Sequence, residues 1–194
     1  MTDMPSFTTT NGPLPENSGW SLYGGRLFAQ VPARVTATAA DDDIEPIEHH
    51  VELEIDVVEG RLACTELRAA RTEGGPPITS DHLRRIPVGS WVELAAEKLN
   101  VVQAIEPTPD GESFRAIDFA WPSTEFVDDG PTEEALESIS QIFAFCMATG
   151  QKPIAVLARE YGLTKQTASR WIATAKRRGI LVEEHRKVDG DAAG

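Results

Sequence analysis

The amino-acid sequence predicts an α+β protein in which a small N-terminal module of β-strands and helices is joined to a C-terminal, all-α helix-turn-helix domain. Apolar residues alternate with acidic ones from His50 to Val58, as in a half-buried strand. Two short helical patterns separated by a glycine lie between Lys152 and Leu181. The charge is also divided unequally, because residues 131–194 carry nine basic and eight acidic side chains in a chain of net charge −13.

Composition divides the 194 residues into five segments. Residues 1–19 are rich in Thr, Pro, Ser, Asn and Gly, which predicts a disordered leader. Residues 20–105 predict an α+β module for dimerisation or partner binding, and residues 106–130 a linker rich in Pro and Gly. The aromatic residues of this linker predict that part of it packs on a domain. Residues 131–182 form the predicted helix-turn-helix domain, and residues 183–194 a polar tail.

The N-terminal module is expected to contain a β-sheet and two short helices. Patterns of β type span residues 26–32 and 34–38, interrupted by Pro32, and residues 50–58 and 62–70 predict a hairpin with one buried and one strongly acidic face. A helix over residues 81–86 is expected after a cap at Thr79 or Ser80, and another over residues 90–102.

A long helix is predicted from Pro131 to Met147, with acidic residues in its first turn. Its apolar residues recur at helical spacing and form a broad stripe. One side of the stripe is expected to pack on the helices that follow. The surplus, which includes Ile142 and Phe145, fits either a dimer contact or burial against the linker aromatics.

Two short helices follow. Pro153 suits the first helical position, Gly162 suits the left-handed conformation that ends a helix, and Thr164 is a good N-cap for the next helix. The expected inward positions are Ile154, Leu157, Ala158 and Tyr161 in the first helix and Ala168, Trp171, Ile172 and Ala175 in the second. Two helices joined by so tight a turn predict a helix-turn-helix, and residues 180–182 fit a short strand after it.

The second helix would then present polar side chains away from the core. Gln166 can pair with an adenine edge and Arg170 or Lys165 with guanine, so these residues and Ser169 are the predicted base contacts. The hydroxyls of Thr164 and Thr167 suit phosphate oxygens. Residues 152–178 contain seven basic residues against one acid, which is the charge pattern of a DNA-contacting element, and Lys152 in this island is expected near phosphate.

The segment AREYGLTKQTASRWIATAKRRGIL, within residues 153–181, resembles the helix-turn-helix regulators of high-GC, actinobacterial bacteria and their phages. The pieces RLACTELRAART, GGPPIT and PVGSWVELAAE, within residues 61–96, resemble an uncharacterised N-terminal module that accompanies such motifs. The resemblance implies DNA binding through the base-contacting residues named above, with Lys176 and Arg177 near phosphates in addition to the two threonines. Tyr161 departs from the pattern, in which a smaller aliphatic residue is more frequent at this position.

No metal or cofactor site is expected. His49 and His50 are adjacent on a strand and therefore point to opposite faces, and no third ligand accompanies them. Cys64 and Cys146 lack metal-type spacing and are predicted to be reduced and buried. No apolar run is long enough to span a membrane and no signal pattern begins the chain, so a cytoplasmic protein without membrane contact is expected.

The predicted function is sequence-specific regulation of transcription, by a non-enzymatic homodimer that binds double-stranded DNA. Two half-sites are the usual way in which one short reading helix per subunit reaches adequate specificity. An alternative is an adaptor or phage assembly protein that acts on a protein partner through the acidic residues of the 20–105 module, with DNA binding accessory. A small recombinase fits less well, because the arginines of the N-terminal half are scattered among acids.

Overall fold

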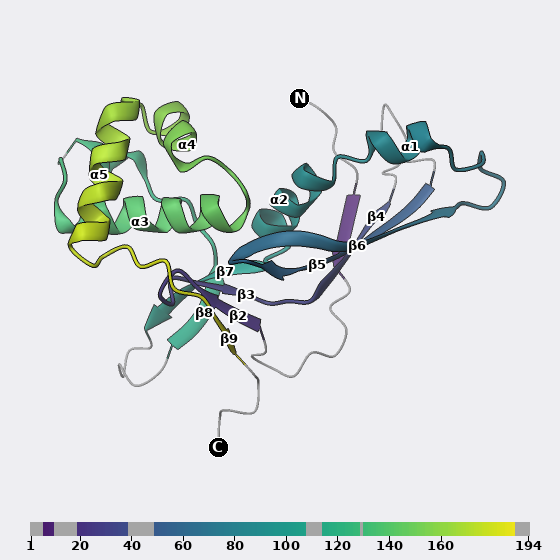
Figure 1. The fold of residues 1–194 in the computed structure, drawn as a ribbon, viewed down its shortest axis with the longest axis horizontal. Helices are drawn as coiled ribbons and strands as arrows, with labels where there is room; N and C mark the ends of the chain where they lie inside the picture. Colours follow the sequence, from purple (N-terminus) through teal and green to yellow (C-terminus); the bar gives the residue numbers. More distant parts are fainter. Residues whose placement is uncertain (1–5, 10–18, 39–48, 108–113, 129, 189–194) are drawn as a thin grey trace, which may run out of the picture.

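A computed structural model of the chain describes residues 6–9, 19–38, 49–107, 114–128 and 130–188. Within these residues the protein is a mixed α+β fold with five α-helices and two antiparallel sheets (Figure 1). The sheets occupy one part of the molecule, and the last three helices lie together beside them.

The first sheet has the strand order β1-β4-β5-β6, formed by Ser6–Thr9, Ala33–Thr38, His49–Val58 and Arg61–Arg71. The alternation seen in the sequence has its expected effect, because Leu53 and Ile55 point into the core and are fully buried. Val35 lies opposite Leu53 on the neighbouring strand, so β4 and β5 contribute to the same apolar layer. The predicted hairpin is therefore confirmed.

A bulge in β6 changes which residues of this strand face the core. Ile55 pairs with Cys64 and Glu54 pairs with Glu66, which leaves Thr65 without a partner position on β5. The Thr65 hydroxyl donates to the Glu54 carbonyl at 3.2 Å. Because one extra residue reverses the alternation, Leu62 faces inward before the bulge and Leu67 and Ala69 pack on the core after it.

The second sheet has the order β8-β7-β3-β2-β9, and its strands come from three distant parts of the chain. The strands β2 and β3 are Gly19–Leu22 and Leu27–Ala29, and the chain then passes Pro32 and enters β4 of the first sheet. The strands β7 and β8 are Val102–Pro107 and Phe114–Asp118, and β9 is Arg186–Val188. The sheet thus joins residues near both ends of the described chain.

Two helices accompany the sheets. Helix α1, Ser80–Arg85, is capped by the predicted Thr79, whose hydroxyl accepts from the His82 N–H at 3.4 Å. Helix α2, Val88–Lys98, packs on β6 and β7 through buried Trp91, Val92, Ala95 and Ala96. It ends earlier than predicted because Asn100 has a positive φ of 53° and Val102 already belongs to β7.

The last three helices are α3 (Glu133–Ala148), α4 (Pro153–Glu160) and α5 (Lys165–Arg177). Helix α3 is capped by Thr132 and packs against both α4 and α5. Its surplus apolar face is buried against the segment before it, where the Phe119 and Phe145 rings stack with centroids 3.9 Å apart. Of the two uses predicted for Ile142 and Phe145, the structure shows burial within the chain, since both are fully buried.

Several segment predictions need correction. The C-terminal part is not all-α, because β9 forms within the predicted tail and pairs with β2, whereas residues 180–182 form no strand. Residues 6–9 of the predicted leader form β1, and the predicted linker contains β8 and the 3₁₀ helix η1, Thr124–Val127. Backbone pairing with distant strands, which sequence periodicity does not report, accounts for β1 and β9. Residue Gly19 of the predicted leader begins β2, and residues 1–5, 10–18, 108–113 and 189–194 lie outside the described residues.

No helix among the described residues is both long and apolar enough to cross a membrane.

Candidate nucleic-acid interface

The predicted DNA-contacting residues lie on α5, at its N-cap Thr164 and, in the case of Lys152, just before α4. Helix α4 begins with Pro153, and its buried side chains are Val156 and Leu157. Ile154, which was predicted to face inward, is 37% exposed, and Val156 takes its place at 4%. The prediction for Ile154 was wrong because Ile154 and Val156 are both apolar. In a helix of only eight residues, spacing does not decide which of the two faces inward.

The turn after α4 is compact and closed by backbone hydrogen bonds. The Leu157 carbonyl accepts from the N–H groups of both Tyr161 and Leu163, each at 3.3 Å. Gly162 between them has a φ of +66°, which favours glycine because this region strains a side chain with a Cβ. Leu163 is buried at 6% exposure. The turn therefore ends α4 and leads directly into α5, as expected from the glycine at position 162.

The N-terminus of α5 is capped by Thr164, whose hydroxyl accepts from the Thr167 N–H at 3.1 Å. The two threonine hydroxyls also lie 2.8 Å apart and hydrogen bond to each other. The four predicted inward positions of this helix are all buried: Ala168, Trp171, Ile172 and Ala175. This confirms the predicted inner face of α5.

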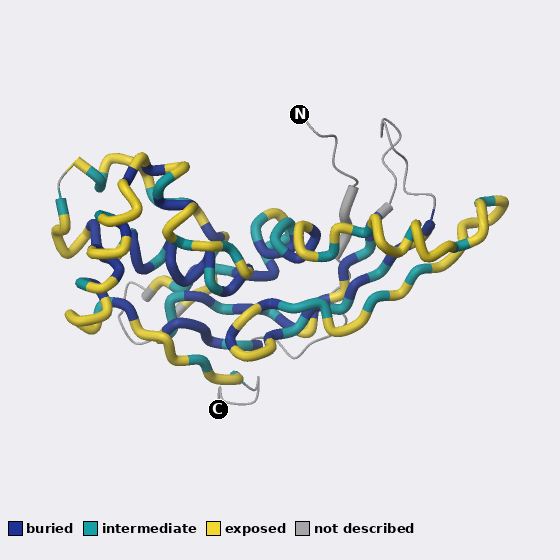
Figure 2. Tube along the Cα trace, turned by 45° about the horizontal axis from the view of Figure 1, so that its top comes forward, coloured by how far each residue is buried: buried dark blue, intermediate teal, exposed yellow. Residues whose placement is uncertain are grey.

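The opposite face of α5 is open to solvent. Lys165, Gln166, Ser169 and Arg170, the predicted base contacts, are all exposed. Figure 2 shows exposed stretches on the outside of the helices at this end of the molecule and buried stretches between them. At about 1.5 Å of rise per residue, the four residues span roughly 7.5 Å along one side of the helix. The structure thus brings them together on a single surface that neither sheet covers.

The charge on this surface is only partly neutralised. Among the described residues, Lys165 and Arg170 have no ion-pair partner, and neither does Lys152, which is exposed at the start of α4. Free cations of this kind are available to bind an anion.

Two other predicted phosphate contacts have partners within the chain. Lys176 forms an ion pair with Glu183 at 2.9 Å and lies 4.9 Å from the centre of the Phe143 ring. Arg177 donates to the Thr174 hydroxyl at 3.2 Å. Both remain exposed, but Lys176 would have to leave a carboxylate to neutralise a phosphate.

Tyr161, which departs from the resembling motifs, has a partner outside the two helices. Its hydroxyl donates to the Pro122 carbonyl at 3.1 Å, and its ring packs on Phe126 of η1 with centroids 5.3 Å apart. Burial raises the pKa of the Tyr161 hydroxyl to about 12. The aromatic residue therefore ties α4 to the segment that precedes α3, which explains its size.

A cleft of about 530 Å³ lies between α2 and α4. Glu93 and Glu97 of α2 line one side, Gln151 and Arg159 the other, and Trp121 and Tyr161 complete it. Its lining comes from separate segments, so no motif in the sequence indicates it. Arg159 is already paired with the adjacent Glu160.

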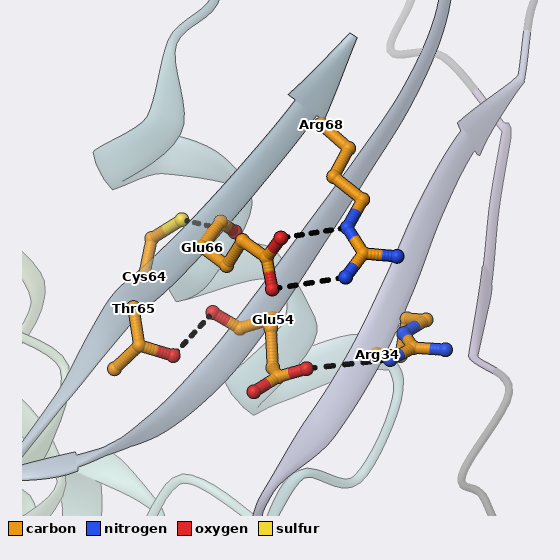
Figure 3. A network of polar contacts seen from close by, with 6 residues as sticks. All are labelled: Arg34, Glu54, Cys64, Thr65, Glu66 and Arg68. Atoms are coloured by element: carbon orange, nitrogen blue, oxygen red, sulfur yellow. Dashed lines mark hydrogen bonds and ion pairs between the residues drawn. The ribbon is translucent and has the colours of Figure 1, made fainter. Parts of the chain in front are cut away.

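The outer face of the first sheet is less acidic than predicted (Figure 3). Arg34 pairs with Glu54 at 3.3 Å, and the Arg68 guanidinium binds both carboxylate oxygens of Glu66, at 2.7 and 3.2 Å. The hydrogen bond from Arg68 lowers the pKa of the Glu66 carboxyl. Arginines on β4 and β6 thus offset two of the carboxylates of the hairpin.

The histidines do not assemble a metal site. His49 is buried and His50 exposed, as their adjacency on β5 predicted. His49 Nε2 lies 2.9 Å from His82 Nδ1 on α1, a contact that sequence spacing did not reveal. Among the described residues, no three His, Cys, Asp or Glu side chains are grouped so that they could hold a metal ion. Cys64 and Cys146 are both free thiols, with Cys146 buried and Cys64 half-buried.

No protein-family model, curated protein or solved structure matches the chain.

Proposed function

We propose that the protein is a non-enzymatic, cytoplasmic, sequence-specific DNA-binding regulator of transcription, in which α4, the turn and α5 act as a helix-turn-helix and α5 is the reading helix. The observation that carries the proposal is the division of α5 into a fully buried apolar face and an exposed face with Lys165, Gln166, Ser169 and Arg170. A helix held by its apolar face and free along a polar, basic face suits the major groove.

The unpaired charges support the same proposal. A net acidic chain repels DNA over most of its surface, so binding would be confined to the basic island on α4 and α5. Lys165 and Arg170 lie within this island without carboxylate partners among the described residues, so no ion pair has to be broken when they meet DNA.

The regulator is proposed to be a homodimer. The apolar surface of α3 is buried against Phe119, Trp121 and the neighbouring helices, so it offers little area for a second subunit. We therefore assign the dimer contact to the sheet module, by which we mean the two sheets together with α1 and α2. A two-fold symmetric arrangement would place two reading helices on half-sites about one turn of DNA apart.

The proposal is tested by selecting fragments of the source genome that the protein retains and measuring binding to the selected duplex. Gln166→Ala and Arg170→Ala are each expected to weaken binding by about 1–3 kcal/mol, because each removes a contact to a base edge. Arg115→Ala is the matched control, since Arg115 is an exposed arginine of β8 paired with Glu106. Fluorescence anisotropy at several salt concentrations gives the affinities.

Two results would contradict the proposal. One is a protein that retains no duplex at low salt, and the other is wild-type affinity in both α5 variants. A site without two-fold symmetry would remove the dimer alone.

The adaptor alternative has less support. It requires a strongly negative surface on the hairpin, and pairing of Glu54 with Arg34 and of Glu66 with Arg68 reduces that charge. Purification of a protein partner bound to the full chain, together with absent DNA binding, would favour it.

A further inference from the structure

The turn between β2 and β3 contacts the chain that leaves α5. The Arg26 guanidinium in this turn forms an ion pair with Glu137 of α3, Nη1 to Oε2, at 2.5 Å. Its other terminal nitrogen donates to the Ile180 carbonyl, just beyond α5. One side chain of the sheet module therefore touches both the helix on which α5 packs and the segment that ends α5.

The segment that Arg26 holds is continuous with the end of α5. The N–H groups of Ile180 and Leu181 both donate to the Ala175 carbonyl, at 3.0 and 3.2 Å. Leu181 is buried at 4% exposure. A shift of the Ile180 carbonyl would thus move the last turn of α5.

The same turn makes further contacts around Arg26. The Gly24 N–H donates to the Glu184 carbonyl at 3.0 Å. Gly24 has a φ of +66°, and a Cβ there would lie 2.9 Å from the Cβ of Val182, so the two backbones approach as closely as a glycine allows. The Tyr23 ring meets Phe143 of α3 edge-on, with centroids 6.3 Å apart.

We propose that Arg26 is a positioning residue for α5. Through Glu137 and the Ile180 carbonyl, the β2–β3 turn fixes the orientation of the reading helix relative to the sheet module. The inference rests on the proposed DNA binding and assigns the sheet module a part in it. In a dimer held by that module, the separation of the two α5 helices would then depend on this turn and not on a free linker.

The test compares Arg26→Ala and Glu137→Ala on the selected duplex. Arg26→Ala is expected to weaken binding about fivefold, because it removes both contacts. Glu137→Ala should weaken binding less, because the hydrogen bond to the Ile180 carbonyl remains, and the double variant should be no weaker than Arg26→Ala. Glu137→Ala gives the sharper test. Loss of a carboxylate near DNA should by charge alone strengthen binding, whereas loss of positioning weakens it. Arg26→Lys keeps the charge and should recover part of the affinity.

Salt dependence separates positioning from direct contact. A residue that neutralises a phosphate lowers the slope of log affinity against log salt by about one when it is removed. Arg26→Ala should leave this slope unchanged. The matched control is Arg34→Ala with Glu54→Ala, which removes an ion pair of similar charge from β4 and β5 of the first sheet and should not alter binding (Figure 3).

Amide hydrogen exchange tests the positioning without DNA. Arg26→Ala should speed exchange at Gly24, Ile180 and Leu181 and leave the β5–β6 hairpin unchanged. If the wild-type protein binds no DNA but exchange changes as expected, the proposed function fails and the link between turn and helix stands. Unchanged exchange, a slope reduced by one, or tighter binding by Glu137→Ala would each overturn the positioning role.

Discussion

Cys146 lies on the buried side of α3 with no exposed surface, and its burial raises the pKa of the thiol from 9.0 to about 12. A raised pKa in the folded protein stabilises the fold while the thiol is neutral in both states, and this stabilisation is lost as pH rises from the unfolded pKa towards the folded one. The free energy of unfolding should therefore fall as pH rises from 9 towards 12.

Urea denaturation across this range tests the effect. Cys146→Ala should flatten the pH dependence between 9 and 10, below the ordinary pKa of tyrosine, although Tyr23 and Tyr161 would still contribute above it. Cys64→Ala is the control, since Cys64 is only half-buried and should have the smaller effect. Equal pH profiles for wild type and Cys146→Ala would show that folding does not raise the pKa of the Cys146 thiol.

At the scale of elements, the proposed reading helix α5 is capped by Thr164, which is also a predicted phosphate contact. Thr164→Ala removes the hydroxyl that accepts from the Thr167 N–H and should lower the free energy of unfolding by about 1 kcal/mol. Thr164→Ser keeps the hydroxyl and should retain stability. Thermal or urea unfolding measures both variants.

The comparison with Thr132→Ala separates capping from DNA contact. Thr132 caps α3 in the same way, accepting from the Ala135 N–H at 3.2 Å, but is not among the predicted DNA contacts. Both alanine variants should lose similar stability, and only Thr164→Ala should also lose DNA affinity. Equal affinity in the two would remove Thr164 from the proposed interface.

The helices were the most predictable elements because their signals are local. Thr79, Thr164 and Pro153 stand at the beginnings of α1, α5 and α4, and each acts within one turn of its own position. The inner face of α5 followed from spacing because four buried residues, from Ala168 to Ala175, recur at helical spacing within a helix of 13 residues. Helix α4 is shorter, and there the same reasoning put Ile154 inside in place of Val156.

The sheets were less predictable because their pairing is not local. The bulge at Thr65 leaves a sign in the sequence, since apolar residues shift from even positions, Leu62 and Cys64, to odd ones, Leu67 and Ala69. The strand β9 leaves none, because Arg186 and Lys187 read as a polar tail and form a strand only by pairing with β2. Of the candidate site, the exposed face of α5 was predictable, whereas the contacts of Arg26 with Glu137 and with the Ile180 carbonyl beyond α5 depend on pairing between distant segments.

For the whole molecule, the pairing of β9 with β2 predicts that the C-terminal segment is needed for stability. A chain ending at His185 lacks β9 and should lose about 1–3 kcal/mol of unfolding free energy, since the hydrogen bonds to residues 19–21 are lost. A chain ending at Val188 keeps the strand and is the control. Urea unfolding of the two chains measures the difference, and equal midpoints would mean that β9 contributes nothing to stability.

The position of β9 in the chain also bears on how the protein is made. During synthesis β2 emerges early, whereas β9 emerges only after the other strands and helices of the described residues. Until then β2 has an unpaired edge, open to strands of other nascent chains. The second sheet is therefore completed late in synthesis, and the interval before its closure is the time at which this protein is most prone to aggregate.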